Sequence, residues 1–127
     1  MVFPENLKYT SDHEWIRIEG NVAYAGITDY AQSELGEIVF VDIPTLGETL
    51  KKGSVFGSIE AVKTVSDLLI PISGTVSDVN PDLEAQPEFV NSDPYGKGWI
   101  IQIDFSNREE LKELMDAEAY KTFIGKS

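Results

Sequence analysis

Ser58-Ile59-Glu60-Ala61-Val62-Lys63-Thr64-Val65-Ser66-Asp67-Leu68-Leu69-Ile70 is the segment that decides the fold of this chain. Its two halves are rich in β-branched and apolar residues, which predicts strands over residues 55–62 and 65–70. The tight turn between them has none of the Gly, Asn, Asp or Pro residues usual in two-residue hairpin loops. Lys63, a long cationic amine, stands there instead. Such a local departure is typical of a functional site, although a solvated hairpin lysine is the alternative.

Short strand-like runs separated by turns extend to both sides of this hairpin. The predicted strands cover residues 15–18, 22–27, 38–43, 72–76 and 99–105. The segment Glu19-Gly20-Asn21 between the first two predicts a hairpin turn. The nearly unbroken apolar run 38–43 predicts a strand buried on both faces. Alternation in 99–105 places Trp99, Ile101, Ile103 and Phe105 on one face. Many short strands with regular turns indicate a β-sandwich or flattened barrel.

Three short helices interrupt the strands. Thr28 is a suitable N-cap for a helix that ends near Gly36. The segment Ser106-Asn107-Arg108-Glu109 reads as a capping box, and an apolar stripe of Leu111, Leu114 and Met115 follows it. Asp116 is placed to cap a last helix that carries Tyr120, Phe123 and Ile124. Residues 81–94, rich in Pro, Asp and Asn, read as a loop with one turn of helix.

Composition narrows the class of protein. The length, 127 residues, predicts one domain over residues 1–127. A net charge of −12, from 22 acids and 10 bases, argues against a nucleic-acid partner and permits electrostatic steering towards basic protein surfaces. The alternative is that the acidic surface serves solubility alone.

The sequence has no cysteine, which excludes disulfides and thiolate chemistry of its own. No stretch is long and apolar enough for a membrane span, and no targeting sequence is evident, so we expect a cytoplasmic protein, or a mitochondrial one only if a presequence has been removed.

Four blocks of sequence carry a resemblance to a known family. They cover residues 9–15, 26–41, 60–67 and 91–99. In this order they closely resemble the H protein of the glycine cleavage system, a lipoyl carrier, from about Leu7 to the last helix. One departure is Ala61, where the family usually has serine. The resemblance implies a mainly β barrel-sandwich hybrid of the lipoyl and biotinyl kind, with short helices and a C-terminal helix.

The resemblance also implies a cofactor and a function. Lipoate would be joined in amide linkage to Lys63 as a swinging arm. The protein would be a carrier and no enzyme, and its arm would accept an aminomethyl group from a pyridoxal-phosphate glycine decarboxylase. A tetrahydrofolate-dependent aminomethyltransferase would take the one-carbon unit, and a flavin dihydrolipoyl dehydrogenase would reoxidise the dithiol. The chemistry would be the cofactor's, and the protein would present and protect it.

Roles for further residues follow from the same resemblance. Glu60, with Asp67 and Gly47, would serve recognition by the lipoylating enzymes. Glu14 and Asp67 would stabilise the protonated amine of the loaded arm, because an adjacent carboxylate favours the cation. The alternatives are solvated acids for Glu14, Glu60 and Asp67, and a turn glycine for Gly47. His13 reads as structural, since no second histidine or nucleophile accompanies it, and no metal site is expected.

Two other functional classes stay open at this point. The Glu-Ala-Val-Lys context argues against a biotinyl carrier, whose site reads Met-Lys-Met, and against other lipoyl domains, whose site reads Asp-Lys-Ala. An H-like protein that acts only as lipoyl donor or relay would keep Lys63 and its recognition residues. We expect a monomer with neither nucleic-acid nor membrane partners.

Overall fold

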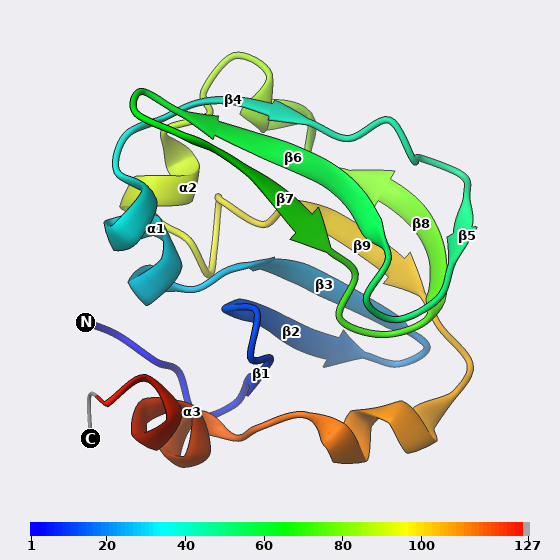
Figure 1. The fold of residues 1–127 in the computed structure, drawn as a ribbon. Coiled ribbons are helices and arrows are strands. Elements are labelled where there is room, and N and C mark those ends of the chain that lie inside the picture. The colour runs from blue at the N-terminus through cyan, green and yellow to red at the C-terminus, as the bar shows by residue number, and fades with distance from the viewer. Residues whose placement is uncertain (126–127) are drawn as a thin grey trace.

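The computed structural model describes residues 1–125 and contains two antiparallel sheets that face each other (Figure 1). The larger sheet has the strand order β1-β2-β3-β9-β8-β5 and the smaller has the order β4-β6-β7. The large sheet consists of β1 (Lys8–Tyr9), β2 (Glu14–Glu19), β3 (Val22–Ile27), β9 (Ile101–Asp104), β8 (Gly74–Val79) and β5 (Thr49–Leu50). The small sheet consists of β4 (Ile38–Asp42), β6 (Val55–Ala61) and β7 (Val65–Leu69). This arrangement confirms the expected β-sandwich.

Within residues 1–125, five helical segments join or cover the sheets. They are α1 (Asp29–Leu35), the 3₁₀ helix η1 (Pro81–Leu83), α2 (Phe89–Ser92), the 3₁₀ helix η2 (Arg108–Glu113) and α3 (Ala117–Ile124). In Figure 1, α1 and α2 lie at the end of the sandwich where β6 turns into β7, and α3 lies beside β1. Among the described residues, no helix has the length and apolar character needed to cross a membrane.

Alternation along β2 and β3 divides the apolar side chains between two clusters. Ile16, Ala23 and Ala25 point into the main core between the sheets. Trp15 points to the other face, into a second cluster where Tyr9 stacks on Tyr120 of α3 with ring centroids 4.9 Å apart. The C-terminal helix is therefore held by aromatic packing on the outer face of the large sheet.

Several local predictions are confirmed. Thr28 Oγ1 accepts a hydrogen bond from the Ala31 amide at the start of α1, which ends at Gly36. Asp116 caps α3 in the same way, through the Ala119 amide. The turn between β2 and β3 has Gly20 at its first central position with φ 67°, the conformation that favours glycine in a two-residue hairpin.

Three predictions are wrong. Strand β4 is an edge strand with Val39 and Phe40 exposed, so it is not buried on both faces. The helix after residue 106 is a 3₁₀ segment capped by Asn107, whose Oδ1 accepts from the Glu109 amide, so the capping box at Ser106 does not form. Trp99 precedes β9 and packs edge-on against Tyr24, with centroids 5.2 Å apart, on the face opposite Ile101. The outcomes for β4 and Trp99 depended on packing partners distant in the sequence, whereas the cap at Asn107 is a local hydrogen bond.

Candidate functional site

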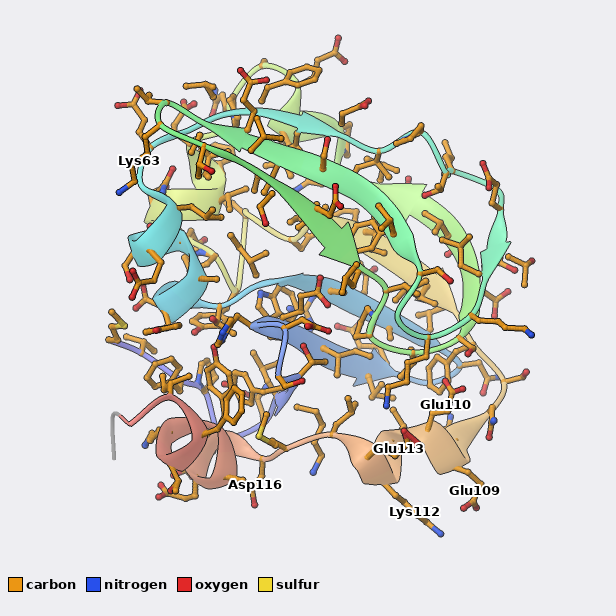
Figure 2. All side chains as sticks on the ribbon, viewed as in Figure 1. Lys63, Glu109, Glu110, Lys112, Glu113 and Asp116 are labelled. Carbon is orange, nitrogen blue, oxygen red and sulfur yellow. The ribbon has the colours of Figure 1, made fainter. Side chains whose placement is uncertain are left out.

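Lys63 stands at the tip of the β6–β7 hairpin and projects beside α1, away from the sandwich (Figure 2). The Ala61 amide donates to the Thr64 carbonyl at 2.7 Å, so Val62 and Lys63 form the turn. The Val62 amide donates to the Glu37 carbonyl at 3.0 Å, which ties the tip to the chain entering β4. Both turn residues are exposed. The tip is thus fixed by backbone bonds, while its lysine stays accessible.

Gly36, at the C-terminal end of α1, lies beside the Lys63 side chain, and we call this end of the helix the support of Lys63. Gly36 has φ 83°, a conformation that favours glycine, and a Cβ atom there would lie 3.4 Å from Lys63 Cε, which is ordinary van der Waals contact. Asn91 fixes this support: its Nδ2 donates to the Gly36 carbonyl at 2.8 Å and its Oδ1 accepts from the Ile38 amide at 2.9 Å. Asn91 therefore connects the end of α1 to the start of β4.

A cleft of about 270 Å³ opens near this support, between the start of β2, helix α1 and strand β7. Leu35 of α1, next to Gly36, contributes to its wall. Glu14 and Asp67, far apart in the sequence, both line it. Asp67 is exposed, whereas Glu14 is buried with 4% of its surface accessible. Solvation of Glu14 is therefore excluded, and the cleft brings together the two carboxylates that the sequence singled out.

Glu14 carries an unusual carboxyl group. Its Oε2 accepts a hydrogen bond from the Leu69 amide at 2.9 Å, which links the two sheets at the edge of β7. Its Oε1 is buried and has no partner among residues 1–125. Burial raises the pKa of the Glu14 carboxyl well above its ordinary value, and the Leu69 hydrogen bond opposes this in part. A buried acceptor without a partner is suited to binding a donor, above all a cationic one.

A buried hydrogen-bond chain holds the wall of the cleft. His13 Nδ1 lies 2.9 Å from Tyr120 Oη, which lies 2.8 Å from Thr28 Oγ1. Thr28 already accepts from the Ala31 amide, so its hydroxyl proton is satisfied only when it donates to Tyr120. In this arrangement Tyr120 donates to His13 Nδ1, which accepts as a neutral imidazole with its proton on Nε2. Burial also lowers the pKa of His13, against the nearby acids Asp12 and Glu34.

The backbone of His13 is unusual as well. It is the only residue besides glycines with positive φ in the described structure, at 67°. Non-glycine residues in this region are uncommon and concentrate at functional sites. The sequence predicted a structural histidine, and the hydrogen bond between His13 and Tyr120 agrees with that role. The sequence gave no sign that Tyr120 and Thr28 would be in the same hydrogen-bond chain. The positive φ cannot be read from residue type alone.

The other recognition candidates are spread out. Glu60 is exposed on β6 opposite Val65, close to Lys63 in the hairpin. Gly47 lies on the turn before β5, where its amide donates to the Val76 carbonyl of β8 at 2.8 Å and its φ is 89°. Its conformation favours glycine, and its hydrogen bond connects it to β8 and not to the Lys63 turn.

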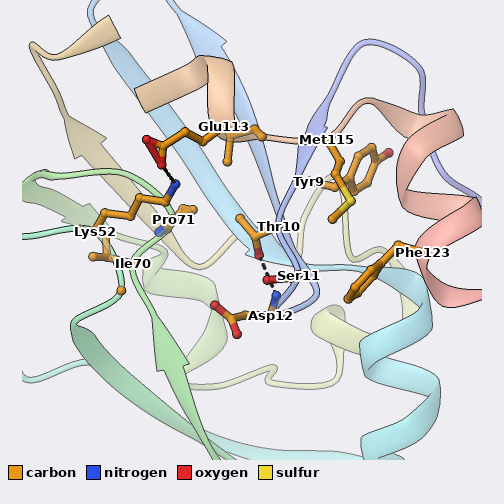
Figure 3. Close-up of a pocket in the computed structure, with 12 residues that line it drawn as sticks. Tyr9, Thr10, Ser11, Asp12, Lys52, Ile70, Pro71, Glu113, Met115 and Phe123 are labelled. Atoms are coloured by element: carbon orange, nitrogen blue, oxygen red, sulfur yellow. Dashed lines mark hydrogen bonds and ion pairs between the residues drawn. The ribbon is translucent and has the colours of Figure 1, made fainter. Parts of the chain in front are cut away.

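A second cavity of about 320 Å³ lies between the β1–β2 turn, residues 70–71 and the η2–α3 connection (Figure 3). Its rim contains the Lys52–Glu113 ion pair, with 2.6 Å between Nζ and Oε1, and the bond from the Asp12 amide to Thr10 Oγ1. Asp12 lines both cavities.

The geometry is that of a β-sandwich with an accessible lysine at a hairpin tip and a cleft lined by Glu14 and Asp67 nearby. Comparison with known proteins identifies the family. The sequence profile of the glycine cleavage H-protein family matches residues 7–127, and the chain belongs to this family.

Individual relatives agree with this assignment. Glycine cleavage system H proteins of Bacteroides fragilis and Bacteroides thetaiotaomicron are 61% and 58% identical, each over 98% of both chains. The crystal structure of a glycine cleavage system H protein from Mycobacterium marinum superimposes with a TM-score of 0.85 at 36% identity, over 97% of this chain and 99% of that one.

Proposed function

We propose that the protein is the lipoyl carrier of a glycine cleavage system, with lipoate in amide linkage on Nζ of Lys63. The observation that carries this proposal is the exposed Lys63 at the hairpin tip of a chain that belongs to the H-protein family. The cofactor would supply a dithiolane that accepts the aminomethyl group of glycine and is left as a dithiol after transfer. The protein's own residues would present this arm and protect what it carries.

The cleft supports the protective role. The arm would start beside Gly36 and reach a cavity whose wall includes the neighbouring Leu35. Glu14 would accept a hydrogen bond from the ammonium end of the cargo through its unpartnered Oε1. Asp67, exposed on the rim, would add a weaker attraction because water screens it. The amine would stay protonated while the arm rests in the cleft.

Partners follow from the cycle. They would be the pyridoxal-phosphate decarboxylase, the tetrahydrofolate-dependent aminomethyltransferase, the flavin dehydrogenase and the enzymes that attach lipoate. The carrier would meet each as a monomer. Glu60 and Asp67 would contribute to recognition by the lipoylating enzymes, since both lie on the hairpin strands, whereas Gly47 would act indirectly by shaping the turn before β5.

Two measurements test the proposal. Intact mass after expression in lipoylating cells should show one added lipoyl group, and peptide mapping should place it on Lys63. Lipoylation of Lys51 or Lys52 in place of Lys63 would refute the assignment. Exchange of glycine carboxyl with labelled bicarbonate, with purified decarboxylase, should require the lipoylated protein. Lipoylation without exchange would indicate a relay that only passes lipoate on.

A further inference from the structure

Four exposed apolar side chains gather around the turn that carries Lys63. They are Val39, Phe40, Val62 and Val65, with 41%, 52%, 71% and 64% of their surface accessible. We call these four residues the hairpin patch. Apolar side chains exposed singly are ordinary, but a group of them beside a modified residue marks an interaction surface. The role proposed for the cleft, protection of the loaded arm, does not involve the hairpin patch, because none of its four residues lines the cleft.

The strand register explains how these residues come together. Ile38 pairs with Ala61 and Phe40 pairs with Glu60, so Val39 is an extra residue in a β-bulge. As a result two consecutive side chains, Val39 and Phe40, are both exposed. Glu60 in turn pairs with Val65, which places Phe40, Glu60 and Val65 in one row across β4, β6 and β7. Bulges next to functional sites commonly re-aim side chains in this way.

Acidic groups accompany the patch. Glu60 lies within the row, and Glu37 is joined to Val62 through its backbone carbonyl. Neither carboxylate forms an ion pair with any residue in 1–125. Two copies of this face would oppose like charges, and the whole chain carries −12, so pairing with a second copy is disfavoured. The complementary surface has an apolar centre and Lys or Arg at its rim.

We propose that the hairpin patch is the docking surface for the enzyme that acylates Lys63, a partner with an apolar recess bordered by basic residues. The inference rests on the proposed lipoylation of Lys63. In that step Nζ attacks the carbonyl carbon of an activated lipoate. The amide C–N bond forms, the bond to the adenylate or thioester leaving group breaks, and the amine loses a proton.

Geometry distinguishes this enzyme from the other partners. Its reacting carbon must come within bonding distance of Nζ, so its active site must enclose the hairpin tip and cover the adjacent side chains. Enzymes that act on the distal sulfurs reach the cofactor at the far end of a long arm. The acylating enzyme is therefore the partner for which contact with Val62, Val65 and Phe40 is unavoidable.

The experiment compares two identical substitutions on the same sheet. Val65→Thr removes apolar surface from the patch, and Val55→Thr does so at the far end of β6, where Val55 is 49% exposed. Phe40→Thr and the Phe40→Thr/Val65→Thr double variant complete the set. Unmodified protein is incubated with a lipoate–protein ligase, ATP and lipoate, and acylation is followed by intact mass. Thermal unfolding establishes that each variant is folded.

We expect kcat/KM for acylation to fall about fivefold or more for Val65→Thr and Phe40→Thr, and further for the double variant, because interface anchors have effects of this size. Val55→Thr should stay within twofold of wild type. Rates for all variants within twofold, with Lys63 still modified, would overturn the docking surface and leave the carrier function intact. A wild-type chain that takes no lipoyl group would refute both. A concentration-dependent dimer abolished by Phe40→Thr would assign the patch to self-association and also overturn the proposal.

Discussion

Glu14→Gln isolates the charge of the cleft carboxylate with little change in shape. The side-chain amide oxygen keeps the hydrogen bond from the Leu69 amide, and an amide NH₂ replaces the unpartnered Oε1. Glu14→Ala is a poorer test, because it leaves the Leu69 amide unpaired at a loss of about 1–3 kcal/mol in stability. The glutamine variant should therefore fold normally and accept lipoate on Lys63 at the wild-type rate.

The expected effect on the loaded arm can be estimated. A hydrogen bond between a carboxylate and an ammonium contributes about 1.5–3 kcal/mol. Ionising this buried carboxyl opposes part of that gain, as its raised pKa indicates, so the lower end applies. About 1.4 kcal/mol corresponds to tenfold in rate. Glu14→Gln should therefore release its cargo about ten times faster than wild type.

The assay follows ammonia release from the loaded carrier after the decarboxylase is removed and with no transferase present. Asp42→Asn is the matched control, because it removes the same charge from an exposed residue of β4 that does not line the cleft. Release from Glu14→Gln within twofold of both wild type and Asp42→Asn would show that Glu14 does not guard the cargo.

The same variant has a signature in stability that is independent of cofactor. The folded-state pKa of Glu14 lies above its ordinary value of 4.5, so the native state binds the proton more tightly than the unfolded chain. This contribution to stability is present below pH 4.5 and is lost as pH rises towards the folded-state pKa. Glu14→Gln should lack that decline, so its stability relative to wild type should rise with pH across this window. Denaturant titrations at several pH values measure the difference, and parallel curves for the two proteins would contradict the burial argument.

Four further outcomes are expected. Lys63→Arg keeps the charge but loses the acylable primary amine, so intact mass should show a folded protein without lipoate; any lipoyl group on this variant would place the site elsewhere. Asp67→Asn should shorten the lifetime of the loaded arm by less than threefold, since Asp67 is exposed; an effect as large as that of Glu14→Gln would make it the main guard. Tyr120→Phe removes the hydrogen bonds to His13 and Thr28 but keeps the ring packing, and should lower the free energy of unfolding by about 1–3 kcal/mol in denaturant titration. An unchanged free energy would show that these two hydrogen bonds add nothing to stability. Association with the decarboxylase should slow as salt is added, because the net charge is −12, and salt-independent rates would leave solubility as the role of that charge.

Local structure could largely be predicted from the sequence, because it depends on neighbours a few residues away. The caps at Thr28 and Asp116, the Gly20 turn and the strands on either side of Lys63 all follow from residue types within one turn or one hairpin. Lys63 itself is identified by its departure from turn chemistry and by the sequence blocks around it. The family assignment follows from those blocks, and comparison with known proteins confirms it.

Tertiary structure decided what depends on distant partners. The run 38–43 has the composition of a buried strand, yet strand order makes β4 an edge, so the same apolar residues become a surface. Glu14 meets the Leu69 amide 55 positions away, and His13 meets Tyr120 across 107 positions. Sequence identifies a carboxylate or a histidine but does not fix how much water reaches it, since burial is set by whichever sheet or helix packs above. The sequence by itself therefore singled out Lys63 as the expected site of attachment. Only the packing of β7 and α3 against β2 and α1 decided that a cleft lies near it, with a buried carboxylate oxygen that has no partner among residues 1–125.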